Sequence, residues 1–217
     1  MRIDFVSDVA CPWCAIGFSA LELAIARAEP DIGAVEVHLQ PFELNPTMPA
    51  AGADAAQYLS DKYGLSADQL AANRERIAER GAAEGFEFGA RMHVWNTFDA
   101  HRLLFLAGAE GAPGVQRALK RALLAAYHGE GRNPSAHDVL LELGVSAGLP
   151  AERVRAVLAG SDFADEVRQA ERFWQEIGVH SVPAIIIDRR HLISGGQPSA
   201  VFEQALRQIA AERPATG

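Results

Sequence analysis

Strand-like sequence occurs only near the two ends of the chain, and this distribution constrains the fold more than any other feature. Near the start, residues 2–6 have the pattern of a short buried strand, and residues 35–39 alternate apolar and polar side chains like a second strand. Near the end, residues 184–187 form a continuous apolar run, and residues 191–193 follow after a turn. Between these segments the apolar residues recur at helical spacing. The sequence therefore predicts an α/β protein whose sheet is assembled from both ends of the chain.

The order of these segments predicts the domain organisation. A helical pattern joins the first two strands, and Pro198 begins a final helix after the last strand. Neither end is large enough to enclose a core by itself, so we expect one four-stranded sheet built from both ends. The predicted domain is therefore discontinuous, consisting of residues 1–45 and 178–217. Residues 46–177 are expected to form an insertion made of helices only.

Composition excludes several classes of partner. The 217 residues carry a formal net charge of -8, so the overall field attracts neither nucleic acid nor an anionic membrane surface. No apolar run approaches the ~20 residues that cross a bilayer, and the first residues do not resemble a secretory leader. We therefore expect a cytoplasmic protein with neither a nucleic-acid nor a membrane partner. No oligomeric state follows from the sequence.

The two cysteines, Cys11 and Cys14, enclose a Pro-Trp dipeptide at the start of the first predicted helix. If Cys11 is the N-cap, Pro12 takes the first helical position, where its missing N–H costs nothing. The Cys11 sulfur then faces free backbone N–H groups and the positive end of the helix dipole, and both favour the thiolate. Cys14 lies one turn further on, where it can attack a mixed disulfide at Cys11 and release the product. The spacing predicts a redox-active Cys11–Cys14 disulfide without a bound cofactor, with Trp13 exposed beside it to contact substrate.

Two other interpretations of the cysteines are a structural zinc site and a pair of buried structural thiols. Structural zinc normally has four Cys or His ligands. The chain has no second cysteine pair, and its closest histidines in sequence, His93 and His101, are eight positions apart. We therefore predict no metal site. The position of the cysteines at the mouth of a strand–helix–strand unit favours redox chemistry.

Two further segments are candidates for the site. Pro183 directly precedes the apolar run 184–187, where a trans proline at the start of a strand is the ordinary interpretation. Residues 96–102 are compatible with two interpretations. One is a helix capped by Asn96, and the other is a functional segment that brings His101 to the active-site cleft.

Five motifs, in the same order along the chain, resemble those of a known family. They are Ser7-Asp8-Val9-Ala10-Cys11-Pro12-Trp13-Cys14, Pro41-Phe42-Glu43-Leu44-Asn45-Pro46, Asn96-Thr97-Phe98-Asp99-Ala100-His101-Arg102, Ser181-Val182-Pro183 and Ser194-Gly195-Gly196-Gln197-Pro198. Together they span nearly the whole chain and resemble the DsbA-like thioredoxin-fold oxidoreductases, in particular their FrnE-like branch. The resemblance implies a thioredoxin-like fold with a large all-helical insertion.

The same resemblance bears on the site and its partners. It implies a cis bond before Pro183, which would face the cysteine pair, and a Val182 backbone offered to an extended substrate segment. It also implies that the partners are protein or small-molecule thiols and disulfides, with glutathione as a candidate redox partner.

Relatives on this scaffold carry out different chemistry. The sequence is also similar to the kappa-class glutathione transferases and the 2-hydroxychromene-2-carboxylate isomerases, which have a serine in place of the first cysteine and bind glutathione as cofactor. Because Cys11 stands at that position, we expect thiol–disulfide exchange. A glutathione-dependent isomerase or transferase is the alternative, and a non-catalytic binding module is a third hypothesis. We expect residues 46–177 to determine substrate choice without supplying chemistry, because the cysteines and Pro183 lie in the terminal segments.

Overall fold

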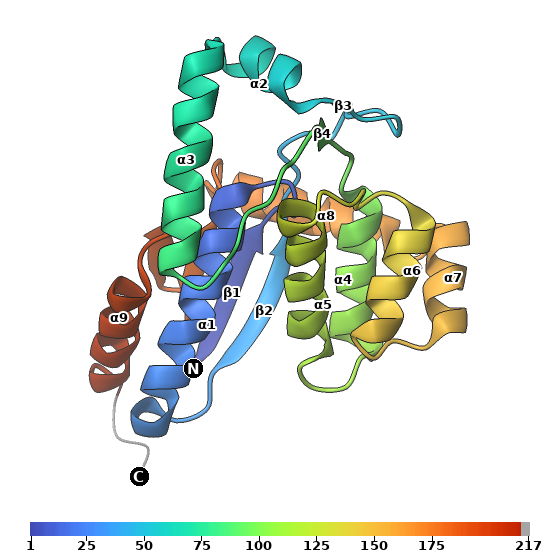
Figure 1. Cartoon of the computed structure of the whole chain (residues 1–217). Coiled ribbons are helices and arrows are strands. Elements are labelled where there is room, and N and C mark those ends of the chain that lie inside the picture. Colours follow the sequence, from blue (N-terminus) through green and yellow to red (C-terminus); the bar gives the residue numbers. More distant parts are fainter. Residues whose placement is uncertain (214–217) are drawn as a thin grey trace.

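A four-stranded mixed sheet forms the centre of the molecule, and the computed structural model describes residues 1–213 (Figure 1). Its strands are β1 (Arg2–Ser7), β2 (Glu36–Pro41), β5 (Ala184–Ile187) and β6 (His191–Ser194). In the order β2-β1-β5-β6, β1 is parallel to β2 and antiparallel to β5. Phe5 of β1 lies opposite Leu39 on one side and Ile185 on the other. Both ends of the chain therefore build one sheet, as predicted.

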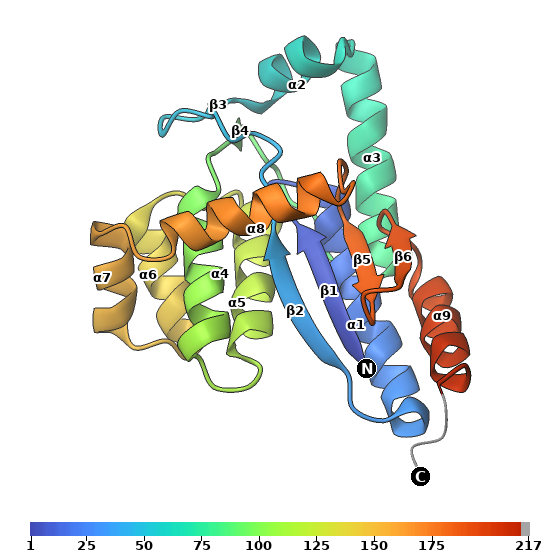
Figure 2. The ribbon, with the colours of Figure 1, turned by 180° about the vertical axis from the view of Figure 1, so that it is seen from behind.

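Two helices from the terminal segments cover one face of this sheet. Helix α1 (Pro12–Ile32) follows β1, α9 (Ser199–Ala211) follows β6, and the two helices pack side by side (Figures 1 and 2). The buried face of α1 includes Phe18, Leu21 and Ile25, at the helical spacing seen in the sequence. The last four positions of the predicted segment 178–217 lie outside the described residues.

The segment between β2 and β5 is mostly helical. Its helices are α2 (Ala55–Tyr63), α3 (Ala67–Ala83), α4 (Phe98–Glu110), α5 (Val115–Leu124), a π-helix (Ala125–Gly129), α6 (His137–Ser146), α7 (Ala151–Ala159) and α8 (Ala164–Glu176). Helices α4, α5 and α8 contact β2, whereas α3 runs along α1 (Figure 1). One continuous cluster of buried apolar side chains extends from β1 into α4, α5, α6 and α7, so the sheet and the insertion share a core. Across residues 1–213, every helix is too short or too polar to cross a bilayer.

The insertion also contains two short strands, so the prediction of helices only was wrong. Strand β3 (Ala53–Asp54) pairs antiparallel with β4 (His93–Val94). A strand of two residues cannot display an alternating pattern, and these strands therefore have no signature in the sequence.

Helix α4 begins at Phe98, later than a cap at Asn96 predicts. Thr97 occupies the N-cap position, and the Asn96 side chain instead accepts the Phe98 backbone N–H at 2.8 Å. The Asn96 amide also donates to the Met48 carbonyl at 3.2 Å. Asn96 therefore stabilises the turn before the helix and connects it to the loop after β2.

Candidate active site

The two cysteines lie where β1 leads into α1. Cys11 is the N-cap of this helix, with φ -88° and ψ 115°, and Pro12 is the first helical residue, as predicted. The backbone N–H of Cys14 donates to the Cys11 carbonyl at 3.1 Å. Both side chains are free thiols. Cys11 is 4% exposed and Cys14 is 0% exposed, so Cys11 is the more accessible of the two.

The Cys11 sulfur makes no capping hydrogen bond in this structure, which differs from the arrangement predicted for a thiolate. Its Sγ lies 3.7 Å from the carbonyl oxygen of Val182, where a protonated thiol donates to the carbonyl. A thiolate cannot donate, so it would turn instead to the N–H groups of the first helical turn. The Cys11 side chain thus lies between the Val182 carbonyl, which accepts a hydrogen bond from the thiol, and the start of α1, whose backbone N–H groups stabilise the thiolate.

The loop before β5 brings Val182 and Pro183 against α1. The Val182–Pro183 bond is cis, as the resemblance implies. Gly17 of α1 permits this close approach, because a Cβ atom there would lie 3.1 Å from Pro183 Cγ and 3.2 Å from Gly196 Cα. A side chain at position 17 would require the loop to shift by a few tenths of an ångström. The residues predicted for the site do not include Gly17.

Trp13 is partly buried, although the sequence predicts an exposed side chain. The guanidinium of Arg76, on α3, lies 5.8 Å from the centroid of the Trp13 ring. Figure 1 shows α3 running beside α1, with the start of α1 near its middle. The insertion therefore covers part of the ring that follows Cys11, which the sequence pattern of α1 alone does not reveal.

Asp8 is a fully buried carboxylate three positions before Cys11. It accepts the backbone N–H groups of Ala10 at 3.0 Å and Leu44 at 2.7 Å. The Thr97 hydroxyl donates to it at 2.8 Å, and His101 Nε2 lies 3.3 Å away. Burial alone would raise the pKa of Asp8, but the bond to His101 and the two backbone bonds outweigh burial and hold the pKa below its usual value. The structure thus brings His101 into the site, and it also places Thr97 and Asp8 there.

Burial controls the protonation of Cys14. It raises the pKa of the Cys14 thiol well above its ordinary value, and the hydrogen bond and charge of Cys11 raise that pKa further. The charge of Lys120 acts in the opposite direction. Cys14 is therefore a thiol at neutral pH and must lose a proton before it can attack a disulfide.

Two residues of the insertion stabilise the loop that leads to Cys11. His128, in the π-helix, lies with Nε2 2.8 Å from the Val9 carbonyl, and Arg91 donates to the Ala10 carbonyl at 3.1 Å. Burial, followed by the charge of Arg91, lowers the pKa of His128 to about 3. The ring is therefore neutral at pH 7, and its Nε2 carries the proton that it donates to Val9. Neither residue could be found from hydrophobic periodicity, because both contacts join segments far apart in the chain.

Lys120 of α5 is a further buried charged residue of the insertion. Its side chain is 0% exposed, and its Nζ atom has no hydrogen-bond partner among residues 1–213. Lys120 precedes the buried residues Leu123 and Leu124 by three and four positions, so helical spacing does place it on the apolar face of α5. This spacing is the signal from which the buried position of Lys120 could be predicted.

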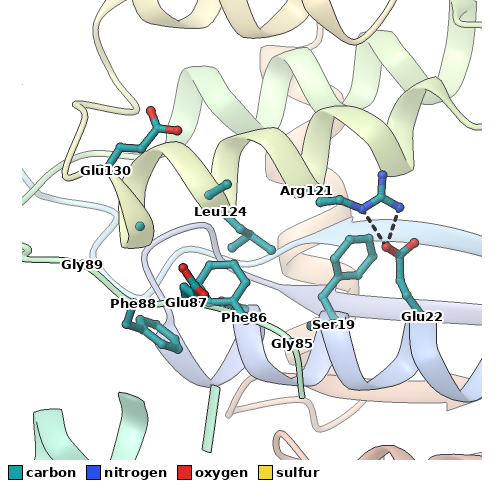
Figure 3. Close-up of a pocket in the computed structure, with 14 residues that line it drawn as sticks. Ser19, Glu22, Gly85, Phe86, Glu87, Phe88, Gly89, Arg121, Leu124 and Glu130 are labelled. Carbon is teal, nitrogen blue, oxygen red and sulfur yellow. Dashed lines mark hydrogen bonds and ion pairs between the residues drawn. The ribbon is translucent and has the colours of Figure 1, made fainter. Parts of the chain in front are cut away.

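A cavity of about 550 Å³ lies between α1, residues 85–89 and α5 (Figure 3). Phe86 lies on one side of it, and Glu22 forms an ion pair with Arg121 at its rim. None of the residues that line it is a cysteine. Among residues 1–213, moreover, no group of three or more His, Cys, Asp and Glu side chains is arranged to hold a metal ion.

Comparison with known proteins places this geometry in a family. A family model described as a DSBA-like thioredoxin domain matches residues 2–207. The crystal structure of a probable DsbA oxidoreductase from Streptomyces coelicolor is 39% identical, with a TM-score of 0.90 over 100% of this chain and 93% of that chain.

Two more distant structures share the fold. A 2-hydroxychromene-2-carboxylate isomerase is 14% identical, with a TM-score of 0.69 over 98% of this chain and 97% of that chain. The cytosolic disulfide reductase DsbM from Pseudomonas aeruginosa, in a structure with GSH, is 22% identical, with a TM-score of 0.65 over 95% of this chain and 100% of that chain. The thioredoxin-like fold with a helical insertion is therefore confirmed, and the chain belongs to the family of DsbA-like thioredoxin domains.

Proposed function

We propose that the protein is a thiol–disulfide oxidoreductase in which Cys11 is the nucleophile and Cys14 the resolving thiol. The observation that carries this proposal is the placement of Cys11 at the N-cap of α1, with the fully buried Cys14 one turn behind it. A thiolate at a helix N-terminus is stabilised by the free N–H groups there, and the thiolate is the species that attacks a disulfide.

The reaction proceeds in two exchange steps. The Cys11 thiolate attacks one sulfur of the substrate disulfide, so that a mixed disulfide forms and the first substrate thiolate leaves. Cys14 then attacks the Cys11 sulfur, which forms the Cys11–Cys14 disulfide and releases the second substrate thiolate. The substrate gains two electrons and the protein loses two. The same steps in reverse oxidise a dithiol.

The surroundings of Cys11 suit an extended substrate. The Val182 backbone lies next to the Cys11 sulfur, and we propose that it pairs with a substrate segment in the manner of an added strand. The partly exposed Trp13 ring would contact the same substrate. We expect protein or small-molecule thiols and disulfides as partners, and the disulfide reductase structure that contains GSH supports a trial of glutathione.

The glutathione-dependent isomerase or transferase stays the alternative. Position 11 separates the two hypotheses, because the sequence similarity described above associates a serine there with isomerase and transferase chemistry. Cys11 and a second thiol one turn behind it favour disulfide exchange. The assignment to the FrnE-like branch and the cytoplasmic location stay predictions.

Single cysteine variants test the proposal. After incubation with oxidised glutathione, Cys14→Ser should retain glutathione as a mixed disulfide, detected as an added mass, because no thiol is left to resolve it. Cys11→Ser should show no such adduct, and its disulfide exchange should fall to background. Retention of exchange by Cys11→Ser would contradict the assignment. Isomerisation of a 2-hydroxychromene-2-carboxylate by Cys11→Ser would support the alternative.

A further inference from the structure

Arginines of the insertion contact the residues on either side of Cys11, and the proposed chemistry does not yet use them. Arg91 donates to the carbonyl of Ala10, the residue directly before Cys11, at 3.1 Å. The guanidinium of Arg76, on α3, lies 5.8 Å from the centroid of the Trp13 ring, two positions after Cys11. Arg76 is exposed and Arg91 is half-buried. The nucleophile is therefore flanked by two positive charges that solvent reaches.

A third arginine, Arg80, lies one helical turn after Arg76 on α3. It donates to the carbonyl of Gly196 at 3.4 Å. Gly196 packs against the start of α1, because a Cβ atom at this position would lie 2.7 Å from the Trp13 carbonyl oxygen. Arg76 and Arg80 therefore both lie on the side of α3 that faces Trp13, in agreement with the course of α3 beside α1 in Figure 1.

The guanidinium groups of these three arginines are not neutralised by ion pairs. Within residues 1–213, none of the three has a carboxylate oxygen within 4.0 Å of a side-chain nitrogen. Elsewhere, by contrast, Arg117 and Arg121 share Glu22, and Arg153 is paired with Glu110. The chain carries a net charge of -8, so a shortage of carboxylates does not explain the unpaired arginines.

The carboxylates nearest in sequence do not offset these charges at the surface. Asp8, three positions before Cys11, is 0% exposed, and four donors already occupy its oxygens. Glu75 and Glu79 belong to α3, but neither is ion-paired with an arginine in the described part of the chain. A substrate that approaches Cys11 therefore meets guanidinium groups that are free to bind an anion.

We propose that Arg76, Arg80 and Arg91, which we call the arginine rim, select disulfides that carry carboxylate groups near their sulfur atoms. This inference rests on the oxidoreductase function proposed above and names its class of substrate. A guanidinium can bind a carboxylate through two parallel hydrogen bonds, and it attracts one over about 10 Å at ordinary ionic strength. The arginine rim holds the carboxylates of the substrate while the Cys11 thiolate attacks its sulfur.

The proposal gives the expected role of the insertion a specific form. Residues 46–177 are expected to determine substrate choice without supplying chemistry, and the whole arginine rim lies within them. The terminal segments then provide both thiols, while α3 and the segment after it provide the charges that select the substrate.

Three disulfides of similar size separate the effect of charge from that of reactivity. They are dithiodipropionate, which is an anion, bis(2-hydroxyethyl) disulfide, which is neutral, and cystamine, which is a cation. The rate at which each oxidises the reduced protein, followed by mass after acid quenching, is divided by its rate with free dithiothreitol. At low salt this normalised rate should be about tenfold higher for dithiodipropionate than for the neutral disulfide, and lowest for cystamine. In about 1 M salt most of the preference should disappear, because screening then limits exposed charges to about 3 Å.

Replacing Arg76 tests the arginine rim itself. Arg76→Met should lower the preference for dithiodipropionate over the neutral disulfide about threefold, in the range of one exposed ion pair. Arg76→Lys keeps the charge and should retain most of the preference. Arg74→Met is the matched control, because it removes the same charge from an exposed residue of α3 that lies two positions away and faces another direction. An equal fall in Arg76→Met and Arg74→Met would overturn the proposal, since net charge would then explain it.

Paired peptides distinguish a small-molecule substrate from a protein substrate. Two disulfide-linked peptides that differ only in having Glu or Lys beside each cysteine are compared in the same assay. A preference for the Glu peptide larger than that for dithiodipropionate would indicate an acidic protein segment, and the reverse would indicate a small anionic disulfide. Either result supports the proposal. The absence of a preference for carboxylates in both sets would overturn it without any variant.

The neutral disulfide distinguishes this inference from the proposed function. If it fails to oxidise the wild type, or reacts equally fast with Cys11→Ser, the oxidoreductase assignment is wrong. A normal reaction with the neutral disulfide, together with no preference for carboxylates, would show that only the role of the arginine rim is wrong.

Discussion

Two buried polar clusters, one around Asp8 after β1 and one around Glu43 after β2, differ in how many donors each of their carboxylates receives. Asp8, after β1, has four donors, namely the backbone N–H groups of Ala10 and Leu44, the Thr97 hydroxyl and the His101 ring. These donors keep the pKa of Asp8 below its usual value even though burial acts to raise it. The carboxylate next to the cysteines is therefore ionised throughout the neutral range.

The second cluster, after β2, has two carboxylates and one cation. Arg168 of α8 contacts both Glu43 and Glu171, and its bond to Glu171 is 2.8 Å long. One oxygen of each glutamate has no partner within residues 1–213. Burial therefore raises the pKa of both glutamates, and Arg168 only partly offsets it. The comparison shows that the number of donors, rather than the depth of burial, decides whether a carboxylate is stabilised as an ion.

The two clusters should respond to pH in opposite ways. The pKa of Asp8 is lower in the folded protein than in the unfolded chain, so its contribution to stability is present at neutral pH and is lost as the pH falls through the folded value. The pKa values of Glu43 and Glu171 are raised, so their contribution is fully present below the unfolded value, about pH 4, and is lost as the pH rises through the folded values.

Asp8→Ala should have the largest effect, because it leaves four donors without their acceptor. We expect a loss of about 4 kcal/mol in the free energy of unfolding at neutral pH, since each buried donor left unsatisfied costs about 1–3 kcal/mol. Urea denaturation followed by circular dichroism measures it. Asp8→Asn, which keeps the shape and one acceptor oxygen, should lose less. A loss below about 1 kcal/mol for Asp8→Ala would mean that the four bonds contribute little.

Arg168→Met should have an intermediate effect that depends on pH. It leaves Glu43 and Glu171 without a cation, and the loss should be about 2 kcal/mol at about pH 7, less than for a fully buried pair because the Arg168 side chain is 36% exposed. The loss should decrease toward about pH 5, where the glutamates bind protons more readily. Adding Glu43→Gln to Arg168→Met should restore part of the stability at neutral pH. If the loss of stability instead grows as the pH falls, the direction of pH dependence predicted for this cluster is wrong.

Thr97→Val should have the smallest effect, because it removes one donor of the four at Asp8. We expect a loss of about 1 kcal/mol in the free energy of unfolding, the usual net contribution of one hydrogen bond. Thr47→Val, at an exposed position, is the control and should change stability by less than about 0.5 kcal/mol. If both variants behave alike, the donors at Asp8 do not act individually, and the comparison with the second cluster would need another explanation.

The order of the elements and the position of the cysteine pair could be predicted because their signals are local. Apolar alternation, helical spacing and the Cys11-Pro12 start of a helix each occupy a few consecutive residues, and steric and hydrogen-bonding rules act at that range. The sequence by itself therefore determined the α/β class, the sheet assembled from both ends and the placement of Cys11 as N-cap. The paired strands β3 and β4 could not be predicted, because a strand of two residues is too short to show apolar alternation.

Only the tertiary structure decided what surrounds the thiols. Asp8 and Thr97 are 89 positions apart yet share a hydrogen bond, and the side chain of Lys120, on α5 of the insertion, is fully buried. The energy of a buried charge depends on which donors, acceptors and other charges meet it in space, and the same lysine or aspartate in the sequence is compatible with an exposed or a buried position. A sequence pattern can place Lys120 on an apolar face, but only the packing of α5 in the folded protein leaves its Nζ atom buried without a hydrogen-bond partner within residues 1–213.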